Sequence, residues 1–455
     1  MLHCKHPLLI AFRNGLPLSM AQDDASLSII QLLLRDFAAM THSAPNVLER
    51  FLRYVQFDTQ SDETSAAAPS TAKQLKLAEA LKDELHQLGI GNAVIGQGGV
   101  VYAHIPASSG CEDLPAVGFI AHMDTSPDAS GCQVKPQIIR FEGTDVLLNQ
   151  TEGICFPVER FPEIKKYIGE DVIFTDGTTL LGADDKSGIA AIMDMAAKIT
   201  ADPTIAHAKL CIAFTPDEEI GRGTDNFDLE RFGADWAVTI DGGEVGTLES
   251  ENFNAGSAVV DFQGVGVHPG SSKGKMVNAL RMAAAFIDAL PADMAPETTE
   301  GREGFLHPNQ LEGTVTHAKL HLLIRDHDRA LYEEKKVILE RIAEDIQSRF
   351  PNGTVTLSVK DSYENMKPYI DRVPAVMEHV RAAYRAAGLE PIEEPIRGGT
   401  DGARLSVMGL PCPNVFTGGL NYHGIYECLP VKSLELAAKV AFELALQSGK
   451  KKMNR

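Results

Sequence analysis

The sequence has few cysteines, no excess of positive charge and no long apolar run, and each absence excludes a class of protein. Its seven cysteines in 455 residues are scattered and never spaced as Cys-x-x-Cys, which argues against a disulfide framework and a cysteine-based zinc site. A net charge of −20 disfavours nucleic acid and anionic lipid as partners. No apolar stretch approaches the roughly 18 residues of a membrane-spanning helix. We therefore expect reduced thiols, a cytoplasmic location, no membrane partner and no nucleic-acid partner.

Two nucleotide-binding motifs are also missing. No Gly-x-Gly-x-x-Gly opens a strand-helix unit, and residues 270–275 imitate a phosphate loop with the wrong spacing and without Ser or Thr after Lys275. The sequence therefore excludes the common dinucleotide and P-loop sites.

The first 45 residues contain one short apolar stretch, Pro7 to Phe12, which superficially resembles a signal peptide. Arg13 interrupts it early, and no convincing small-residue cleavage site follows. We expect residues 1–45 to be a poorly ordered N-terminal extension and the folded part to begin near Asn46.

From Asn46 onward, short apolar strands alternate with amphipathic helices, which is typical of an α/β fold with a mostly parallel sheet. One helix carries four leucines at helical spacing, with Thr71 as a possible N-cap and Gly89 as its stop. The leucines are Leu77, Leu81, Leu85 and Leu88. Strands are predicted at 100–105, 117–121, 210–214 and 236–240.

After Asp241 the pattern changes, which predicts an inserted α+β domain over residues 253–367. Strands are expected near 258–262 and 320–324, with two long helices, one of which carries Val277, Leu280, Ala284 and Ile287. The α/β pattern then resumes with a helix at 376–387, a strand at 414–416 and a helix at 433–447. We predict a discontinuous main domain, residues 46–252 and 368–455, interrupted by the insert.

Three apolar runs of the main domain lead to residues that can bind a metal. The strand at 117–121 delivers His122, that at 210–214 leads to Glu218 and Glu219, and that at 236–240 delivers Asp241. In open α/β sheets, ligands bind outside the carboxyl ends of the strands, where these groups can converge. The alternatives are a surface histidine at His122 and a solvated acidic loop at 217–219.

Further candidates lie in polar turns. Asp124 follows His122 at period-two spacing, so it can fix the tautomer of a ligating imidazole. Gly182 to Asp185 form a tight turn that could equally cap the following helix. His423 lies in a glycine-rich loop, where a histidine is usually only a loop residue.

These segments taken together resemble the peptidase T group of the dizinc M20 peptidase family, which are tripeptide aminopeptidases. The motifs that carry the resemblance are residues 118–128 (Gly-Phe-Ile-Ala-His-Met-Asp-Thr-Ser-Pro-Asp), 182–186, 214–221, 241–243, 396–403 and 421–424. The resemblance extends from Asn46 to about Gln447. It implies a mostly parallel-sheet catalytic domain and an inserted α+β lid domain of the dimerisation type.

The resemblance also implies a role for each matching residue. His122, Asp184 and Asp241 would bind one zinc ion, and Asp184, Glu219 and His423 the other. Glu218 would be the general base, Asp124 would orient His122, and the Asp184–Asp185 peptide bond would be cis. In the lid, His268 would stabilise the oxyanion, while Asn278 and Arg325 would hold the substrate carboxylate, with Arg397 as a second candidate.

Purely structural roles remain as alternatives for two of the lid residues. His268 could be a turn histidine before Pro269, and Arg325 could pair with Asp326 or Asp328. The expected activity is removal of the N-terminal residue from tripeptides in the cytoplasm, with a small peptide as partner and a homodimer through the lid as a further expectation. Two other functions stay open. One is another M20 hydrolase, a carboxypeptidase or an N-acyl amino acid deacylase, and the other is a non-catalytic zinc-binding protein.

Overall fold

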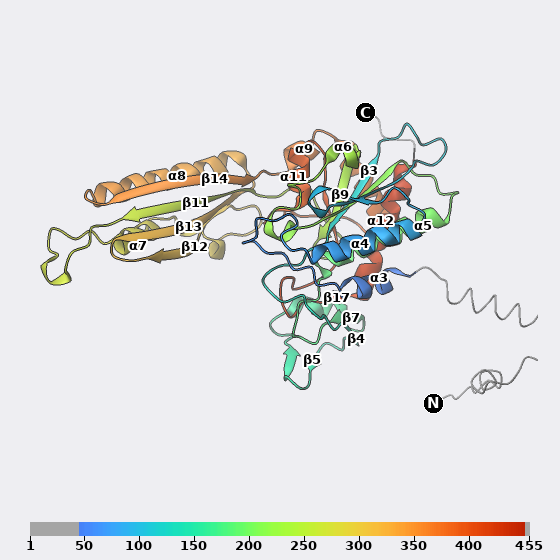
Figure 1. Cartoon of the computed structure of the whole chain (residues 1–455), viewed down its shortest axis with the longest axis horizontal. Helices are drawn as coiled ribbons and strands as arrows, with labels where there is room; N and C mark the ends of the chain where they lie inside the picture. The colour runs from blue at the N-terminus through green and yellow to red at the C-terminus, as the bar shows by residue number, and fades with distance from the viewer. Residues whose placement is uncertain (1–44, 451–455) are drawn as a thin grey trace, which may run out of the picture. The chain divides into compact units, whose positions relative to one another are not determined.

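The computed structural model describes residues 45–450 of the chain (Figure 1). Helix α3 (Val47–Tyr54) begins directly after Asn46, whose side chain accepts a hydrogen bond from the Glu49 N–H in a capping box. That the folded part starts near Asn46 stays a prediction. The predicted extension over residues 1–45 lies outside the described residues, apart from Pro45, and so does Cys4.

The main sheet has eight strands in the order β1-β2-β8-β3-β9-β16-β10-β15. Its central strands β8, β3, β9 and β16 are mutually parallel, and antiparallel neighbours flank them. The strands are β1 (Val94–Ile95), β2 (Val101–Ile105), β3 (Val117–His122), β8 (Leu210–Thr215), β9 (Trp236–Gly242), β10 (Thr247–Glu249), β15 (Ile392–Glu393) and β16 (Asn414–Phe416). The mostly parallel α/β sheet predicted from the sequence is confirmed.

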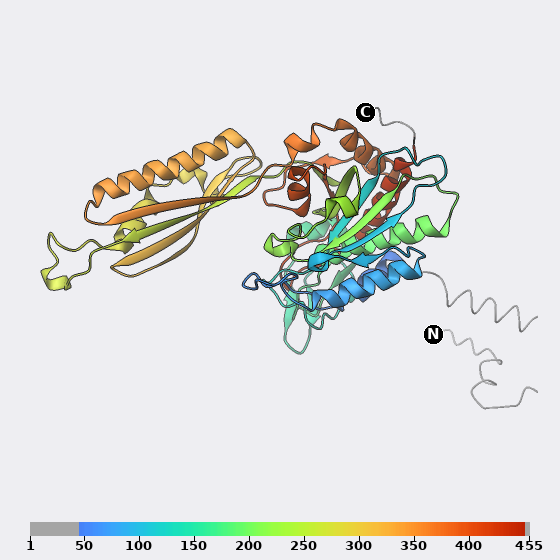
Figure 2. The ribbon, with the colours of Figure 1, turned by 45° about the horizontal axis from the view of Figure 1, so that its top comes forward.

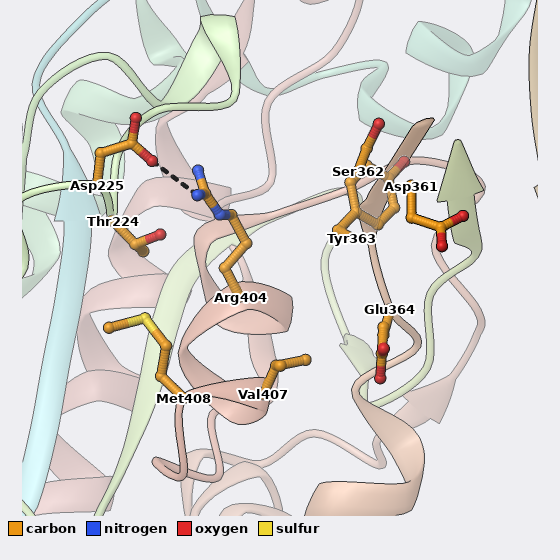
Figure 3. Close-up of a pocket in the computed structure, with 9 residues that line it drawn as sticks. All are labelled: Thr224, Asp225, Asp361, Ser362, Tyr363, Glu364, Arg404, Val407 and Met408. Atoms are coloured by element: carbon orange, nitrogen blue, oxygen red, sulfur yellow. Dashed lines mark hydrogen bonds and ion pairs between the residues drawn. The ribbon is translucent and has the colours of Figure 1, made fainter. Parts of the chain in front are cut away.

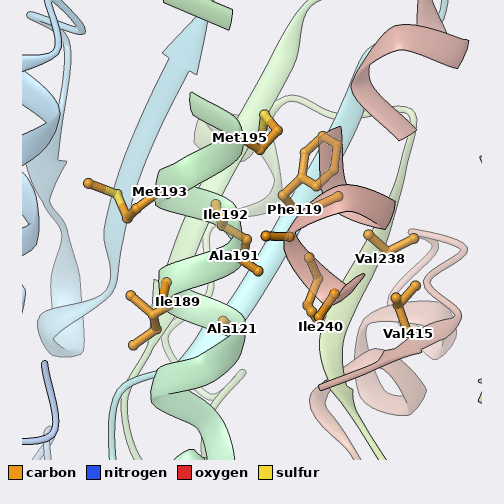
Figure 4. Packing of buried hydrophobic residues seen from close by; sticks show 14 of the residues in the cluster. Phe119, Ala121, Ile189, Ala191, Ile192, Met193, Met195, Val238, Ile240 and Val415 are labelled. Carbon is orange, nitrogen blue, oxygen red and sulfur yellow. The ribbon is translucent and has the colours of Figure 1, made fainter. Parts of the chain in front are cut away.

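The central strands are apolar on both faces because helices cover both sides of the sheet. Along β3, Phe119 and Ala121 pack into the larger hydrophobic cluster, whereas Ile120 belongs to the cluster on the opposite face. The larger cluster receives α3, α4 (Gln74–Gln87), α5 (Ala183–Ala201), α10 (Pro374–Ala387) and α12 (Val431–Ser448). Figure 4 shows α5 laid against the sheet, with Ile192 and Met195 among the buried side chains. The opposite cluster includes Phe232 of α6 (Leu229–Phe232) and Leu405 of α11 (Asp401–Val407).

Helix α4 differs from the prediction at its start. It begins at Gln74 without a side-chain cap, and the Thr71 hydroxyl instead donates to the carbonyl oxygen of Gln60 at 2.8 Å. Thr71 is therefore not the N-cap. Gly89 does follow the helix end with φ of +85°, the left-handed conformation that favours glycine after a helix.

Two small sheets that the sequence patterns did not reveal are built from residues between β3 and α5 and, in one of them, from a further strand just before α12. One has the order β17-β7-β4, built from β17 (Leu429–Pro430), β7 (Asp171–Phe174) and β4 (Gln137–Arg140), and the other pairs β5 (Val146–Asn149) with β6 (Ile154–Phe156). They share a hydrophobic cluster that includes Phe156 and Phe174.

The predicted insert contains its own antiparallel sheet in the order β12-β13-β11-β14. The strands are β11 (Asn254–Gln263), β12 (Phe305–Gly313), β13 (His317–Asp326) and β14 (Thr354–Tyr363), and the helices are α7 (Ala279–Asp288) and α8 (Arg329–Arg349). Figure 2 shows α8 running along these strands. A separate hydrophobic cluster joins both helices to the sheet. The domain boundaries at residues 253 and 367 stay a prediction.

Helix α7 packs against the sheet with a different face from the one that the predicted apolar stripe suggested. Met282 and Phe286 are fully buried against the sheet, whereas Leu280 is 38% exposed. Ala284 is also exposed. Two apolar stripes with the same spacing run along this helix, and the one that contains Phe286 faces the core.

Two composition-based expectations concern the whole chain. The six cysteines within residues 45–450 are free thiols, four of them buried and two exposed, so the expected absence of disulfides is confirmed for that part. No helix of that part is long and apolar enough to cross a membrane. A further short helix among the described residues is α9 (Lys367–Ile370).

Candidate active site

The carboxyl ends of the central strands bring the predicted ligands to one edge of the main sheet. His122 is the last residue of β3 and pairs in register with Thr215 at the end of β8. The chain leaving β8 turns through the short 3₁₀ helix Glu218–Ile220, and Asp241 lies near the end of β9. Convergence of these groups follows from the parallel strand order.

The five predicted ligands form one cluster that is connected by four close contacts. His122 Nε2 lies 2.7 Å from Asp184 Oδ1 and 3.4 Å from Asp241 Oδ1. His423 Nε2 lies 3.2 Å from Asp184 Oδ2 and 2.9 Å from Glu219 Oε2. The two carboxylate oxygens of Asp184 thus face different histidines, which is the arrangement that a bridging ligand requires.

The residues of this cluster fit a pair of divalent metal ions. Ligand atoms of His122, Asp184 and Glu219 lie within 4.8 Å of one another, and so do those of His122, Glu218 and Asp241. Glu219 Oε1 is buried and has no hydrogen-bond partner among the described residues. Imidazole and carboxylate donors without thiolate suit a hydrolytic metal centre. In the second group Glu218 stands where the sequence-based assignment has Asp184, so the division of ligands between two ions stays a prediction.

The charges of the cluster also favour the binding of metal ions. Burial raises the pKa of Asp241 and of Glu219 to about 7, and the neighbouring Asp184 carboxylate adds to both shifts. Hydrogen bonds with Asp184 and Glu219 raise the pKa of His423 to about 11. Burial raises the pKa of Glu218 well above its ordinary value, and the Asp241 carboxylate adds to that shift. The site holds more carboxylates than imidazoles, so bound cations would relieve its repulsion.

Asp124 connects the histidine ligand to the acidic loop. His122 Nδ1 lies 3.0 Å from the carbonyl oxygen of Asp124 and 3.4 Å from its Oδ1, so the backbone makes the closer contact. A carbonyl accepts only from an N–H, so Nδ1 carries a proton, and Nε2 is the ring nitrogen that faces the cluster and would bind a metal ion. His122 is 2% exposed, and the alternative of a surface histidine is excluded.

The acidic loop after β8 is not solvated. Asp217 is 3% exposed, and its carboxylate accepts hydrogen bonds from Ser70 and Gln74. The N–H groups of Glu218 and Glu219 donate to Asp124 Oδ1 and Oδ2. The loop is therefore fixed by interior hydrogen bonds, which aim Glu218 and Glu219 toward the cluster.

The turn that carries Asp184 contributes a side chain to the cluster and also begins helix α5. The Asp184–Asp185 peptide bond is cis, as expected. Asp185 is buried, and its carboxylate accepts from the N–H of Gly188 at 3.1 Å and from the N–H of His122 at 3.1 Å. The two readings of this turn, capping and ligand presentation, are thus compatible in the structure, with Asp185 capping and Asp184 facing the histidines.

Two predicted lid residues lie in local turns of the insert. His268 is exposed, and its Nδ1 accepts a hydrogen bond from the N–H of Gly270 at 3.1 Å. Asn278 is the N-cap of α7 and accepts from the N–H of Leu280 at 3.0 Å. Neither is among the residues that line the pocket around Glu218 and His423. Their substrate roles stay predictions.

Arg325 lies at the end of β13 nearer to the main sheet. Its Nη1 donates to the carbonyl oxygens of Gly256 and Ile324, each at 2.9 Å, and its guanidinium lies over the Tyr363 ring at 5.5 Å. No ion pair joins it to Asp326 or Asp328 among the described residues. Tyr363 in turn lines the pocket beside Glu218.

Arg397 is occupied by contacts within the chain. Its guanidinium donates to the carbonyl oxygen of Gly301 at 2.8 Å and to Thr299 Oγ1 at 3.0 Å. It also lies over the rings of Phe253 and Phe305, at 5.2 and 5.7 Å from their centroids. These contacts join the chain before α11 to the insert, and a substrate contact by Arg397 stays a prediction.

A pocket leads from the cluster to the base of the insert. Glu218, Glu219 and His423 line it together with Ser257 of β11 and Tyr363 of β14. A neighbouring pocket, shown in Figure 3, lies between α11 and the end of β14. There Arg404 pairs with Asp225 at 2.7 Å.

Several buried carboxyl groups around the cluster were not predicted. Asp401 accepts from the Thr215 hydroxyl at 2.8 Å, and burial raises its pKa to about 6. Glu427 accepts three backbone hydrogen bonds from residues 181–184, and Asp185 was noted only as part of a turn. Each acts on backbone or hydroxyl groups of a distant segment, a role that leaves no spacing pattern in the sequence.

Comparison with known proteins places the chain among peptidases. The model of peptidase family M20/M25/M40 matches residues 180–447. Peptidase T of Vibrio parahaemolyticus is 48% identical over 407 residues, covering 89% of this chain and 99% of the relative. Peptidase T of Clostridium acetobutylicum is 49% identical over 399 residues, covering 88% of this chain and 98% of the relative.

Solved structures share the fold. Aminopeptidase PepT from Bacillus cereus superposes with a TM-score of 0.70 at 20% identity, covering 89% of this chain and 98% of that structure. A tripeptidase from Staphylococcus aureus gives a TM-score of 0.71 at 22% identity, with the same coverage of both chains. With relatives nearly half identical over almost their full length, the chain belongs to the M20/M25/M40 peptidase family and, within it, to the peptidase T group.

Proposed function

We propose that the protein is a dizinc aminopeptidase that removes the N-terminal residue from tripeptides. The observation that carries this proposal is the contact of both Asp184 oxygens with different histidines, beside the half-buried Glu218. Membership in the peptidase T group supports the choice of substrate, since the similar solved structures include an aminopeptidase and a tripeptidase.

His122, Asp184 and Asp241 would hold one metal ion, and Asp184, Glu219 and His423 the other. When bound, such a pair supplies Lewis acidity for the scissile carbonyl and a water of lowered pKa. Zinc suits this donor set, in which nitrogen and oxygen ligands occur without cysteine.

The chain's own residues supply the proton transfers and the orientation. Glu218 accepts a proton from the attacking water and delivers it to the leaving amine. Its raised pKa matches both steps, because the carboxyl must take up a proton and release it again. Asp124 holds the backbone of Glu218 and Glu219 while its carbonyl fixes the His122 ring.

The insert would act as a lid over the bound peptide. His268 would donate to the oxyanion that develops on the scissile carbonyl, and Asn278, Arg325 and Arg397 would contact the peptide carboxylate. Because His268 and Asn278 do not line the pocket of their own chain, these contacts require a movement of the lid or a second subunit. We place the enzyme in the cytoplasm, acting on free peptides as a homodimer joined through the lid domain.

Product analysis with an asymmetric tripeptide tests the proposal. Zinc-loaded protein should convert Leu-Gly-Gly to Leu and Gly-Gly, leave N-acetyl-Leu-Gly-Gly intact and cleave Leu-Gly poorly. Release of C-terminal glycine would indicate a carboxypeptidase, and preference for the acetylated peptide a deacylase. Absence of any turnover in protein that holds two zinc ions would favour a non-catalytic zinc-binding protein.

A further inference from the structure

Glu427 is a buried carboxylate that the proposed mechanism does not use. It is 1% exposed and lies just before β17, at the end of the loop that carries His423. Its Oε2 accepts hydrogen bonds from the N–H groups of Leu181 and Gly182, both at 2.7 Å, and its Oε1 accepts from the N–H of Asp184 at 3.1 Å. One carboxylate therefore accepts three backbone donors of a single turn.

These three donors belong to the turn that presents Asp184. Leu181 and Gly182 are buried, so their N–H groups cannot turn to bulk water, and an unpaired buried N–H is costly. Asp184 and Asp185 depart from helical dihedral angles, so the turn does not take its shape from the helix that follows. Glu427 is the side chain that satisfies the turn in its present shape.

The backbone of Glu427 belongs to the stem of the loop that carries His423. Leu420 and Cys428 exchange backbone hydrogen bonds at 2.9 and 3.0 Å, and the N–H of Glu427 donates to the carbonyl oxygen of Gly424. His423 itself has φ of +63°, an uncommon conformation for a residue with a side chain. Its position therefore depends on the short loop being held at its stem.

Glu427 thus connects two segments that are 243 residues apart in the chain. One segment carries Asp184 and the other carries His423, and Asp184 Oδ2 lies 3.2 Å from His423 Nε2. We propose that Glu427 is a positioning residue that sets Asp184 and His423 at the spacing needed to bind the second metal ion. This inference rests on the proposed function, because it presupposes a metal pair at the cluster.

Metal affinity of two Glu427 variants tests the proposal. Glu427→Gln keeps the size of the side chain but turns an NH2 group toward N–H donors, whereas Glu427→Asp keeps the charge on a shorter side chain. Zinc binding is measured by competition with a chromophoric chelator, and thermal unfolding of the metal-free proteins is measured alongside. We expect Glu427→Gln to lower the affinity of one of two zinc sites by about 10- to 100-fold, and Glu427→Asp to lower it less.

Glu84→Gln is the matched control. Glu84 is also a buried carboxylate of the main domain, 9% exposed, and it bonds to Arg50 and Tyr54 rather than to the cluster. The control should lower thermal stability without changing either zinc affinity. A general loss of stability would then be distinguished from a loss of positioning.

Two outcomes would overturn the proposal. One is two-site zinc binding of wild-type affinity in the folded Glu427→Gln variant. The other is failure of both Glu427 variants to fold, which would assign the residue to folding instead. If wild-type protein bound no zinc, the proposed function itself would fail, and if it bound two ions without cleaving tripeptides, only the substrate assignment would fail.

Discussion

The carboxylate of Asp124 accepts a hydrogen bond from the backbone N–H of Glu218 at 3.0 Å, and its second oxygen accepts from the next N–H along the chain at 3.2 Å. Asp124 lies beyond the end of β3, whereas Glu218 follows β8. Their contact fixes the acidic loop relative to the strand that carries His122. Glu218, the proposed general base, and His122, a proposed metal ligand, are therefore both held by Asp124.

Asp124→Asn should weaken this support without removing the side chain. An amide offers one acceptor oxygen instead of two, so one of the two loop N–H groups loses its partner. We expect kcat for tripeptide cleavage and metal affinity each to fall by about 10- to 100-fold. Steady-state kinetics and zinc competition measure the two effects, and unchanged values for both would contradict the assigned role.

Glu218→Gln should abolish proton transfer while leaving the metal site occupied. The amide is isosteric but cannot accept a proton at neutral pH, and general base catalysis contributes about 10²- to 10⁴-fold. We expect kcat to fall by that factor, with wild-type zinc content in elemental analysis. Loss of zinc together with activity would instead assign Glu218 to the ligand set, as its closeness to His122 and Asp241 allows.

Removal of single ligands should separate the two metal sites. Asp184 contacts both histidines, at 2.7 and 3.2 Å, whereas His423 contacts only Asp184 and Glu219 within the cluster. Asp184→Asn should lose both ions after dialysis against a metal buffer, and His423→Ala should retain one. Two retained ions in His423→Ala would show that His423 is not a ligand.

The sequence predicted the central strands well because their signals are local. The predicted strand at 117–121 differs by one residue from β3 (Val117–His122), since an apolar run and its ending are visible in the chain itself. The two small sheets escaped prediction because their strands have two to four residues, too few to display a period. Helix α7 carries two equivalent stripes, and only the packed sheet decides between Leu280 and Phe286.

The candidate site likewise contains residues that local sequence patterns predict and residues that they do not. His122 and Asp241 could be proposed from strand ends, because parallel strands bring their carboxyl ends together. Glu427 acts on backbone groups 243 residues away, and acceptors of this kind show no characteristic residue spacing. The lid residues were placed by resemblance, and their approach to the cluster depends on lid or subunit geometry that strand patterns do not encode.

His268→Ala tests the proposed oxyanion contact. The His268 side chain is exposed, and its hydrogen bond among the described residues is with the N–H of Gly270, so its removal should leave the melting temperature and zinc content unchanged. If it stabilises the oxyanion, kcat should fall about 10²- to 10³-fold. His317 is an exposed lid histidine paired with Asp261 at 2.9 Å, and His317→Ala serves as the control. Equal, small effects of both substitutions would exclude the proposed role.

Glu249 should make the protein less stable as the pH rises. Burial raises its pKa from 4.5 to about 7 in the folded protein, so between these values the unfolded chain gives up a proton that the folded chain retains. The stability that this group contributes is present below pH 4.5 and lost as the pH rises through 7.

Glu249→Gln should therefore gain stability over the wild type as the pH rises. The amide stays neutral and can still accept from Asn414 Nδ2, which donates at 2.7 Å. Because the side chain is partly exposed, we expect a relative gain of about 1–2 kcal/mol between pH 5 and pH 8, less than the full shift would give. Thermal unfolding at both pH values measures it. Glu340→Gln, at an exposed position of α8, controls for the loss of one negative charge, and an equal pH trend in both variants would refute the assignment to Glu249.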